Sequence, residues 1–302
     1  MNPSPSTQAR SSTLLSILIP AYNAPAGVQR CHVQLGDLLA RSDVEVLIGD
    51  DSTQDESAAA IRRLCESFAP TTYSRNEPPL GAAQNWNALL RRATGTYCVV
   101  LHHDEFPRDS TVFAAVLQEI EQPTPPDVIV LGCLIQSRPV ARLRRHCPWS
   151  FVRRVIESEQ HYLFRRNLIG APSAVIVRRD LYQPYDERLR WLVDVDFYYR
   201  LFRSTPRVKC LQGSDIVSAL HPTASITASM RPELKSVRRV ELALISNKYA
   251  SDPKILWLAG TSATQRALRF FEAAAWLSFR LTQRLLATLN DGATVEPIVK
   301  RG

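Results

Sequence analysis

LLSILIPAYN (Leu14–Asn23) is an apolar run that stops at a proline, a tyrosine and an asparagine. A second apolar run, VEVLIGDDST (Val44–Thr53), stops on the paired acids Asp50 and Asp51. Two buried strands with a helical stretch between them are typical of the start of an open parallel sheet. Ligands of such sheets bind beyond the carboxyl ends of the strands, so we expect both polar strand ends to border one crevice.

Strand and helix patterns alternate along the next part of the chain. The patterns predict strands over 71–74, 96–105, 127–135 and 173–179, helices over 56–68, 81–93, 110–121 and 194–204, and two further strands within 207–221. Short connections in βαβα order favour an α/β fold, in which a mainly parallel sheet has helices on both faces. We expect a disordered tail over 1–12, a main domain over 13–228 and a helical C-terminal extension over 229–302.

Composition narrows the class of protein without deciding its function. The 302 residues are 45% hydrophobic, enough for a sizeable core, and no stretch approaches about 20 uncharged apolar residues, so we expect no membrane span. Six scattered cysteines without a C-x-x-C pair argue against a zinc ribbon or a disulfide scaffold. They fit a reducing compartment, and the polar N-terminus has no signal-peptide core, so we expect a cytoplasmic protein. The net charge of +8 suggests an acidic partner such as nucleotide phosphates, anionic lipid or nucleic acid.

Two regions combine arginine with apolar side chains. Between residues 138 and 166, eight arginines are interleaved with aromatic residues. This segment is either a solvated basic face or a site for an anionic acceptor, such as a lipid-linked diphosphate or a membrane surface. In the tail, Arg266, Arg269, Arg280 and Arg284 fall within one arc of a helical wheel. A helix of this kind either docks on its own domain or makes peripheral contact with the inner face of the membrane.

Three polar clusters accompany the predicted strand ends in the first half of the chain. Asp51 can accept hydrogen bonds from a base or a ribose, and the alternative is that it caps the next helix. GAAQNWN (Gly81–Asn87) lies at a helix start, where backbone N–H groups favour phosphate. The third cluster is HHDE, residues 102–105, in which Asp104 is the best ligand candidate because Mg²⁺ and Mn²⁺ prefer oxygen ligands.

The fourth cluster lies on the predicted helix that begins near Asp194. Asp194 and Asp196 are two residues apart, about 200° around a helix, so both cannot face one ligand. One of them can project into the cleft as a general base, while the other caps the helix or pairs with Arg200. The alternative is that both are capping and surface residues.

Taken together, these segments resemble a family 2 glycosyltransferase with the GT-A fold, of the type that makes bacterial cell-surface glycans. The resemblance covers roughly Leu14–His221. It implies a nucleotide-sugar half over 13–135, an acceptor half over 136–228, a hexose donor and a divalent metal, Mn²⁺ or Mg²⁺.

Several motifs carry the nucleotide side of the resemblance. ILIPAYN looks like the family's opening strand, GDDSTQDES is similar to its Asp-Asp-Gly-Ser-Thr-Asp turn with the glycine absent, and AQNWN resembles its Ala-Arg-Asn stretch. The turn implies that Asp51 binds the nucleotide base, with Asp50 supporting the loop. The residues implied to bind the nucleotide sugar are Pro20, Tyr22, Asn23, Asp51, Gln84, Asn85 and His103.

Three further motifs concern the candidate metal ligands and the catalytic base. The family's Asp-x-Asp motif corresponds to residues 102–104 of this chain, so the resemblance implies that Asp104 binds the metal. ALHPTAS resembles a late histidine motif, which makes His221 a second candidate ligand. WLVDVDFYYR resembles the acceptor-side segment that ends in Glu-Asp-x-Asp. Val193 replaces the glutamate, and the catalytic base is carried onto Asp194.

The resulting hypothesis is an inverting, metal-dependent glycosyltransferase of polysaccharide biosynthesis, with Asp194 as general base. It would move a sugar from a nucleotide-diphosphate sugar to a hydroxyl of a glycan or a lipid-linked acceptor. The alternative is a degenerate, non-catalytic sugar-nucleotide binder or scaffold, because His102, Gln84 and Val193 depart from the family motifs. A nucleic-acid partner would leave the acidic strand ends unexplained, so we expect none. The absence of G-x-G-x-x-G after the first strand disfavours a dinucleotide-dependent oxidoreductase.

Overall fold

The computed structural model describes residues 13–68, 71–137, 142–204, 206–219 and 232–255, together with the single positions 274, 277, 278, 281 and 282. Three predictions therefore lie outside the described residues. They are the disordered tail over 1–12, the candidate ligand His221 and the four arginines of the tail helix.

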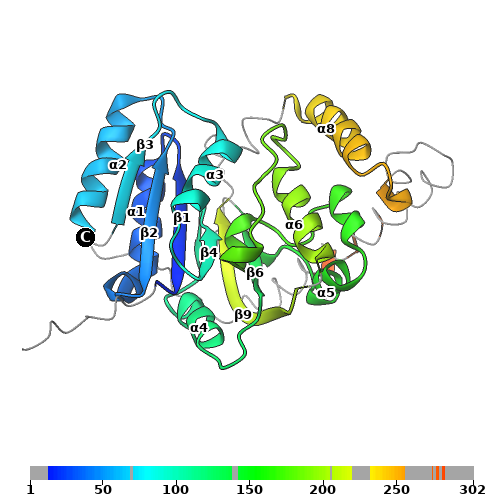
Figure 1. Ribbon diagram of the computed structural model, residues 1–302, viewed down its shortest axis with the longest axis horizontal. Helices are drawn as coiled ribbons and strands as arrows, with labels where there is room; N and C mark the ends of the chain where they lie inside the picture. The colour runs from blue at the N-terminus through cyan, green and yellow to red at the C-terminus, as the bar shows by residue number, and fades with distance from the viewer. Residues whose placement is uncertain are drawn as a thin grey trace, which may run out of the picture.

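One mixed sheet runs through the centre of the molecule (Figure 1). Its strands pair in the order β3-β2-β1-β4-β8-β6-β9-β5, and β7 pairs with β6. The strands are β1 (Leu15–Ala21), β2 (Val44–Asp50), β3 (Thr71–Arg75), β4 (Tyr97–Val100), β5 (Glu105–Pro107), β6 (Val128–Ser137), β7 (Arg142–Arg145), β8 (Val175–Arg178) and β9 (Val208–Ala219).

The first four strands form the parallel part of the sheet. Every residue of β1 is buried, as expected for an apolar strand that is covered on both faces. In the register of the sheet, Ala21 of β1 lies beside Asp50 of β2, and Leu18 lies beside Val100 of β4. The carboxyl ends of these strands therefore meet at one edge, where the sequence predicts the crevice.

The second half of the sheet is mixed. β8 is antiparallel to β4 and β6, β5 is antiparallel to β9, and β6 and β9 are parallel. The prediction of two strands within 207–221 is wrong, because β9 is one continuous strand. Its register shifts so that Leu131 faces Leu211 but Gly132 faces Asp215. Residues 212–214 are accommodated as a bulge, aided by the positive φ of Gly213, and the chain does not reverse there.

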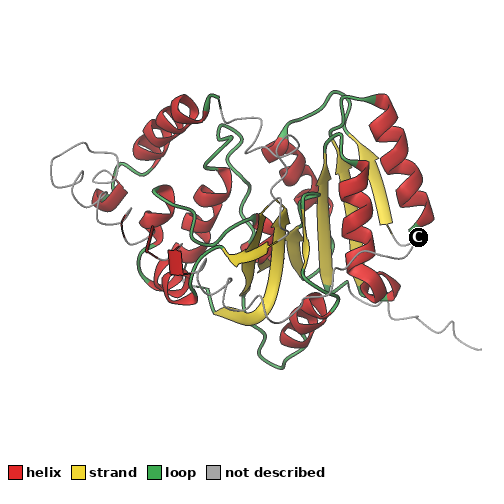
Figure 2. Ribbon diagram, turned by 180° about the vertical axis from the view of Figure 1, so that it is seen from behind, coloured by secondary structure: helices red, strands yellow, loops and turns green. Residues whose placement is uncertain are grey.

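Helices lie on both sides of the sheet, as Figures 1 and 2 show. They are α1 (Pro25–Leu35), α2 (Asp55–Ser67), α3 (Ala82–Arg92), α4 (Thr111–Ile120), α5 (Trp149–Glu157), α6 (Val193–Arg203) and α8 (Leu234–Lys248). Alternate residues of β1 face the two layers: Ile17 and Ile19 pack in the cluster of α1, α2 and α4, and Leu18 packs in that of α3, α5 and α6. The predicted α/β fold with helices on both faces is confirmed.

The predicted C-terminal extension begins with α8, which lies beside α6 at the end of the molecule far from β3 (Figure 1). The ring of Tyr199 in α6 packs against the ring of Tyr249 at the end of α8, and the ring centroids are 4.7 Å apart. Within the described residues, every helix is too short or too polar for a membrane crossing. The division of the main domain into two halves stays a prediction.

Candidate active site

Asp50 organises the end of β2. It is fully buried, its Oδ1 accepts the Ser52 backbone N–H at 2.9 Å, and its Oδ2 accepts the Tyr73 hydroxyl at 2.8 Å. A buried carboxylate needs such donors to offset its lost hydration. Asp50 therefore holds the turn after β2 against β3, which matches the supporting role inferred for it.

Asp51 binds the loop that leads into α3. Its Oδ1 accepts the Asn76 side-chain amide at 2.8 Å and the Leu80 N–H at 3.1 Å, and its Oδ2 accepts the Gly81 N–H at 2.7 Å. Gly81 is the N-cap of α3, so the carboxylate lies at the positive end of that helix. A carboxylate has about four acceptor positions, and these three bonds leave Oδ2 one of them for a ligand.

These contacts bear on two readings of the sequence. Asp51 does not cap the helix that follows it, because its donors come from the start of α3. Of the backbone N–H groups of GAAQNWN, that of Gly81 donates to Asp51, and phosphate binding at this helix start stays a prediction. Gln84 is exposed on the first turn of α3, whereas Asn85 is buried and donates to the Gly49 carbonyl at 2.8 Å. Direct roles of Gln84 and Asn85 in nucleotide binding stay predictions.

Tyr22 and Asn23 directly follow β1. The Tyr22 side chain is 53% exposed, so its ring is available to a ligand. Asn23 adopts a positive φ of 48° and accepts the N–H groups of Thr53 and Gln54, each at 3.1 Å. Asn23 therefore ties the end of β1 to the turn after β2, and that turn supplies Asp51.

The turn after β4 gathers three potential metal ligands. One ligand atom from each of His102, Asp104 and Glu105 lies within 4.8 Å of the others. The turn closes through a hydrogen bond from the Glu105 N–H to the His102 carbonyl at 2.9 Å. Gly27 of α1 approaches this turn so closely that a Cβ there would collide with the carbonyl oxygen of His103. Asp104 was predicted as a ligand, whereas His102 and Glu105 were not assigned that role.

The histidines of this turn have unsatisfied nitrogens. Within the described residues, Nε2 of His102 and Nε2 of His103 are buried without a hydrogen-bond partner. Burial lowers the pKa of His102 to about 4, so its imidazole is neutral at pH 7 and retains a lone pair. Nδ1 of His103 lies 3.1 Å from the Pro20 carbonyl oxygen and must donate to it. A neutral imidazole beside two carboxylates is a donor set that suits Mn²⁺.

Glu105 is the most buried member of the cluster. Burial, and after it the charge of Asp104, raises the pKa of Glu105 to about 8. The Ser173 hydroxyl donates to this carboxyl group and accepts the His102 backbone N–H at 3.0 Å. The acids of this turn therefore repel each other in a poorly hydrated site, and a bound cation would relieve that repulsion.

Asp194 lies on the first turn of α6 and is half-buried. Its Oδ1 accepts the Val195 N–H at 2.8 Å, and its Oδ2 accepts the Asn167 side-chain amide at 2.7 Å. Burial nevertheless raises the pKa of Asp194 to about 7, the range in which a general base works at neutral pH. The segment over 167–173 links Asp194 to the metal cluster, since Asn167 donates to Asp194 and Ser173 donates to Glu105.

Asp196 has a different role, as the helical spacing indicates. It is fully buried and pairs with Arg200 at 3.0 Å and with Lys248 of α8 at 2.9 Å. The prediction that one acid of the pair binds Arg200 is confirmed. Asn167 and Ser173, which hold Asp194 and Glu105, were not predicted, because each is far along the chain from its partner.

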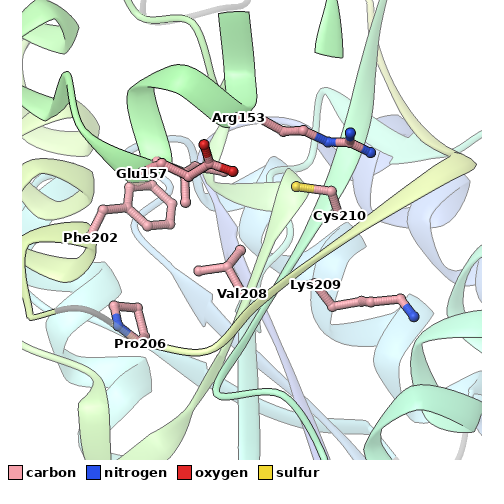
Figure 3. A pocket seen from close by; sticks show the side chains of 8 residues that line it. Arg153, Glu157, Phe202, Pro206, Val208, Lys209 and Cys210 are labelled. Atoms are coloured by element: carbon pink, nitrogen blue, oxygen red, sulfur yellow. The ribbon is translucent and has the colours of Figure 1, made fainter. Parts of the chain in front are cut away.

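A cavity of about 530 Å³ lies away from these residues, between α5, α6 and the start of β9 (Figure 3). It is lined by Arg153, Ile156, Glu157, Phe202, Pro206, Val208, Lys209 and Cys210. None of these is a predicted site residue. Arg153 belongs to the basic segment over 138–166, whose Arg145 instead forms an ion pair with buried Asp215 at 3.0 Å.

A family model described as glycosyl transferase family 2 matches residues 16–185. The match covers more than half of the 302 residues. It includes the ends of β1 and β2 and the cluster after β4, and it stops before Asp194.

Relatives are found among curated proteins and among solved structures. The uncharacterized protein MT1568 of Mycobacterium tuberculosis (strain CDC 1551 / Oshkosh) is 30% identical over 207 residues, which are 62% of this chain and 61% of that protein. The chain thus spans about three fifths of the length of this relative.

Two solved structures are similar in fold. S. aureus TarS 1–349 in complex with UDP-GlcNAc has a TM-score of 0.58 at 17% identity, over 78% of this chain and 67% of that chain. The mannosyltransferase PcManGT from Pyrobaculum calidifontis, in complex with GDP-Man and Mn²⁺, has a TM-score of 0.55 at 16% identity, over 93% and 88%. At these identities the likeness concerns the fold, and the predicted GT-A fold is confirmed.

Proposed function

The chain belongs to glycosyl transferase family 2, and from that premise we propose that it transfers a sugar from a nucleotide-diphosphate sugar to an acceptor hydroxyl, with inversion at the anomeric carbon. One observation carries the proposal. Asp194, a half-buried carboxylate oriented by Asn167, has a pKa of about 7, and the segment over 167–173 links it to a cluster of metal-ligating side chains. This combines a base that is active at neutral pH with a place for the charged leaving group.

The donor is proposed to bind across the ends of β1 and β2. The exposed Tyr22 ring can stack on the nucleotide, and the remaining acceptor position of Asp51 can receive an N–H of the base. Asn23, Pro20 and His103 would support these groups through their contacts along the edge. The bound UDP-GlcNAc and GDP-Man of the two solved relatives favour a uridine or guanosine diphosphate sugar.

We assign a divalent cation to His102, Asp104 and Glu105. An imidazole ligand favours Mn²⁺ over Mg²⁺, and the Mn²⁺ in the mannosyltransferase complex supports that choice. When bound, the ion would stabilise the negative charge of the departing diphosphate. The role of His221 as a further ligand belongs to the same proposal.

Asp194 is proposed to act as the general base. Its carboxylate would take the proton of the acceptor hydroxyl while that oxygen bonds to the anomeric carbon and the bond to the diphosphate breaks. The hydrogen bonds from Asn167 and Val195 fix the direction of the carboxylate before the acceptor arrives. Burial keeps the pKa of Asp194 high enough for the proton transfer to be favourable.

The acceptor is proposed to be a glycan or a lipid-linked sugar, as in polysaccharide biosynthesis. The basic segment over 138–166 supports an anionic or membrane-bound acceptor, since Arg153 and Arg154 are exposed on α5. Peripheral contact with the inner face of the membrane would follow from the same charges.

The test measures release of nucleoside diphosphate from a panel of UDP- and GDP-sugars with Mn²⁺ and candidate glycan or lipid-linked acceptors. Asp194→Asn should keep nucleotide binding and lose acceptor-dependent release by about 10²–10⁴-fold, the usual contribution of a general base. Asp37→Asn, which changes an exposed acid after α1, is the matched control. Full turnover in Asp194→Asn would remove Asp194 from the mechanism.

A non-catalytic sugar-nucleotide binder is the second candidate. The specific observation in its favour is His102, which stands where the family motif has its first acid and whose neutral ring contributes no charge. Such a protein would bind a nucleotide sugar with Mn²⁺ and release no nucleoside diphosphate with any acceptor in the panel.

A further inference from the structure

Glu241 of α8 is a buried carboxylate bound to backbone N–H groups. It is 3% exposed, and its oxygens accept the N–H groups of three consecutive residues. The distances are 2.7 Å from Arg190, 3.1 Å from Trp191 to each oxygen, and 2.8 Å from Leu192. Backbone N–H groups that converge in this way form an anion-binding nest, and hydrogen bonds to a charged acceptor are among the stronger ones.

These three residues lead directly into the helix that carries Asp194. Leu192 is the N-cap of α6, and its carbonyl accepts the Asp196 N–H at 2.9 Å. The backbone that Glu241 holds therefore determines where the first turn of α6 begins. Asp194 is the second residue of that turn, so its direction depends on this backbone.

Two further carboxylates keep α8 in register along α6. Fully buried Asp196 accepts the Tyr249 hydroxyl at 2.6 Å and Lys248 Nζ at 2.9 Å. Farther along, Asp252 accepts the Tyr199 hydroxyl at 2.7 Å and pairs with Arg203 at 3.0 Å. The contacts run from the entrance of α6 to its last turn. A buried ion pair of this kind is a weak source of stability but a strong constraint on geometry.

We propose that Glu241, on the C-terminal extension, is a positioning residue for Asp194, and that the lock between α8 and α6 is part of the active site. The proposal rests on the proposed function, because Asp194 matters only if it is the base. Glu241 acts through the backbone of residues 190–192 and does not touch the acceptor. Its negative charge also raises the pKa of Asp194, and the charge of Asp194 in turn raises the pKa values of Glu105, Tyr185 and Tyr198.

The primary experiment needs no activity. Full-length wild-type protein, Glu241→Gln and the matched control Glu233→Gln are compared, since Glu233 precedes the same helix and is exposed. Hydrogen exchange of the peptide over 187–196 should accelerate in Glu241→Gln alone, because the new amide offers one acceptor to the three N–H groups. Carbon-13 titration of the Asp194 carboxyl, assigned with Asp194→Asn, should give a lower pKa in Glu241→Gln, because a neighbouring negative charge is lost.

The kinetic experiment connects this lock to transfer. In Glu241→Gln, kcat for nucleoside diphosphate release should fall at least about tenfold, since a misplaced base costs rate. The donor KM should stay within about a factor of two, because the donor binds to other strands. The variant Lys248→Met leaves Glu241 and Asp194 in place and should also lower kcat. It provides the kinetic test if Glu241→Gln does not fold.

The outcomes separate the two proposals. Unchanged exchange and an unchanged Asp194 titration in Glu241→Gln would overturn the positioning role, whether or not the protein is active. Faster exchange with wild-type kcat would overturn it as well. Absence of release from the wild-type protein with every donor and acceptor would instead refute the proposed function, and with it any positioning role for catalysis.

Discussion

Replacing Asp194 with asparagine should stabilise the folded protein at alkaline pH while it removes the proposed base. Burial raises the pKa of Asp194 from an ordinary value of 3.8 to about 7. The folded state therefore favours the protonated carboxyl. The contribution of the protonated Asp194 to the free energy of unfolding is complete below about pH 3.8 and is lost as the pH rises to about 7. Above that pH the wild-type protein carries an ionised group at a cost of about 4 kcal/mol, which a neutral asparagine avoids.

Part of that gain is offset by a lost contact. The Asn167 amide donates to Oδ2 of Asp194 at 2.7 Å, and an amide in place of the carboxylate weakens or inverts this bond at a cost of about 1–2 kcal/mol. We therefore expect a net gain of about 2–3 kcal/mol at about pH 8. The cost of the lost bond does not vary with pH. The difference between variant and wild type should thus grow by about 2–3 kcal/mol from about pH 5 to about pH 8.

Urea unfolding of the wild-type protein, Asp194→Asn and the control Asp37→Asn measures this difference at both pH values. Asp37 is exposed, so its variant should follow the wild type at each pH. A difference between Asp194→Asn and wild type that does not change with pH would refute the reasoning, because Asp194 would then ionise in the folded protein as freely as in water.

Three further outcomes depend on the same edge of the sheet. At the metal cluster, Mn²⁺ should raise the thermal midpoint of the wild-type protein more than Mg²⁺ does, because imidazole suits Mn²⁺. The variant His102→Ala should lose that preference. An equal response of the wild-type protein to both ions would contradict the assignment of His102. At the end of β2, Asp51→Asn should lower stability by about 1–3 kcal/mol and weaken nucleotide binding, since an amide cannot accept from all three donors. Urea unfolding and calorimetric titration measure the two effects, and an unchanged nucleotide affinity would argue that Asp51 serves the loop alone. In the wild-type protein, release of nucleoside diphosphate at saturating donor should fall about tenfold per pH unit below about pH 7, because Asp194 must be ionised to act; a flat profile there would exclude Asp194 as the base.

The fold was predictable where the hydrophobic pattern of a segment matches its burial in the folded protein. Most residues of β1 and β2 are buried and apolar, because both faces of these strands are covered, and each run ends where polar residues begin. The prediction failed at β9, where two strands were expected and one strand contains Gly213 with a positive φ. Only the pairing with β6 makes that glycine part of a bulge within one strand.

The candidate site was predictable in part for a similar reason. The prediction of the family from its short motifs is confirmed, and these motifs lie at strand ends that the parallel register brings to one edge. Asp104 and Asp194 could be named because they fall on the family's acidic motifs. His102 could have been named as well, since it lies two residues before Asp104, at the position of the first acid in that motif.

The sequence by itself determined the alternation of strands and helices from β1 to β4, the acids at the strand ends and the family. These depend on residues near one another in the chain, where hydrophobic periodicity and turn residues act locally. The partners of those acids were decided by the tertiary structure alone. Asn167 meets Asp194, Ser173 meets Glu105, and Glu241 meets the backbone before α6 across separations of 27, 68 and about 50 residues. Partners across such separations depend on the tertiary fold, because no local sequence pattern specifies which distant group will lie beside a given acid.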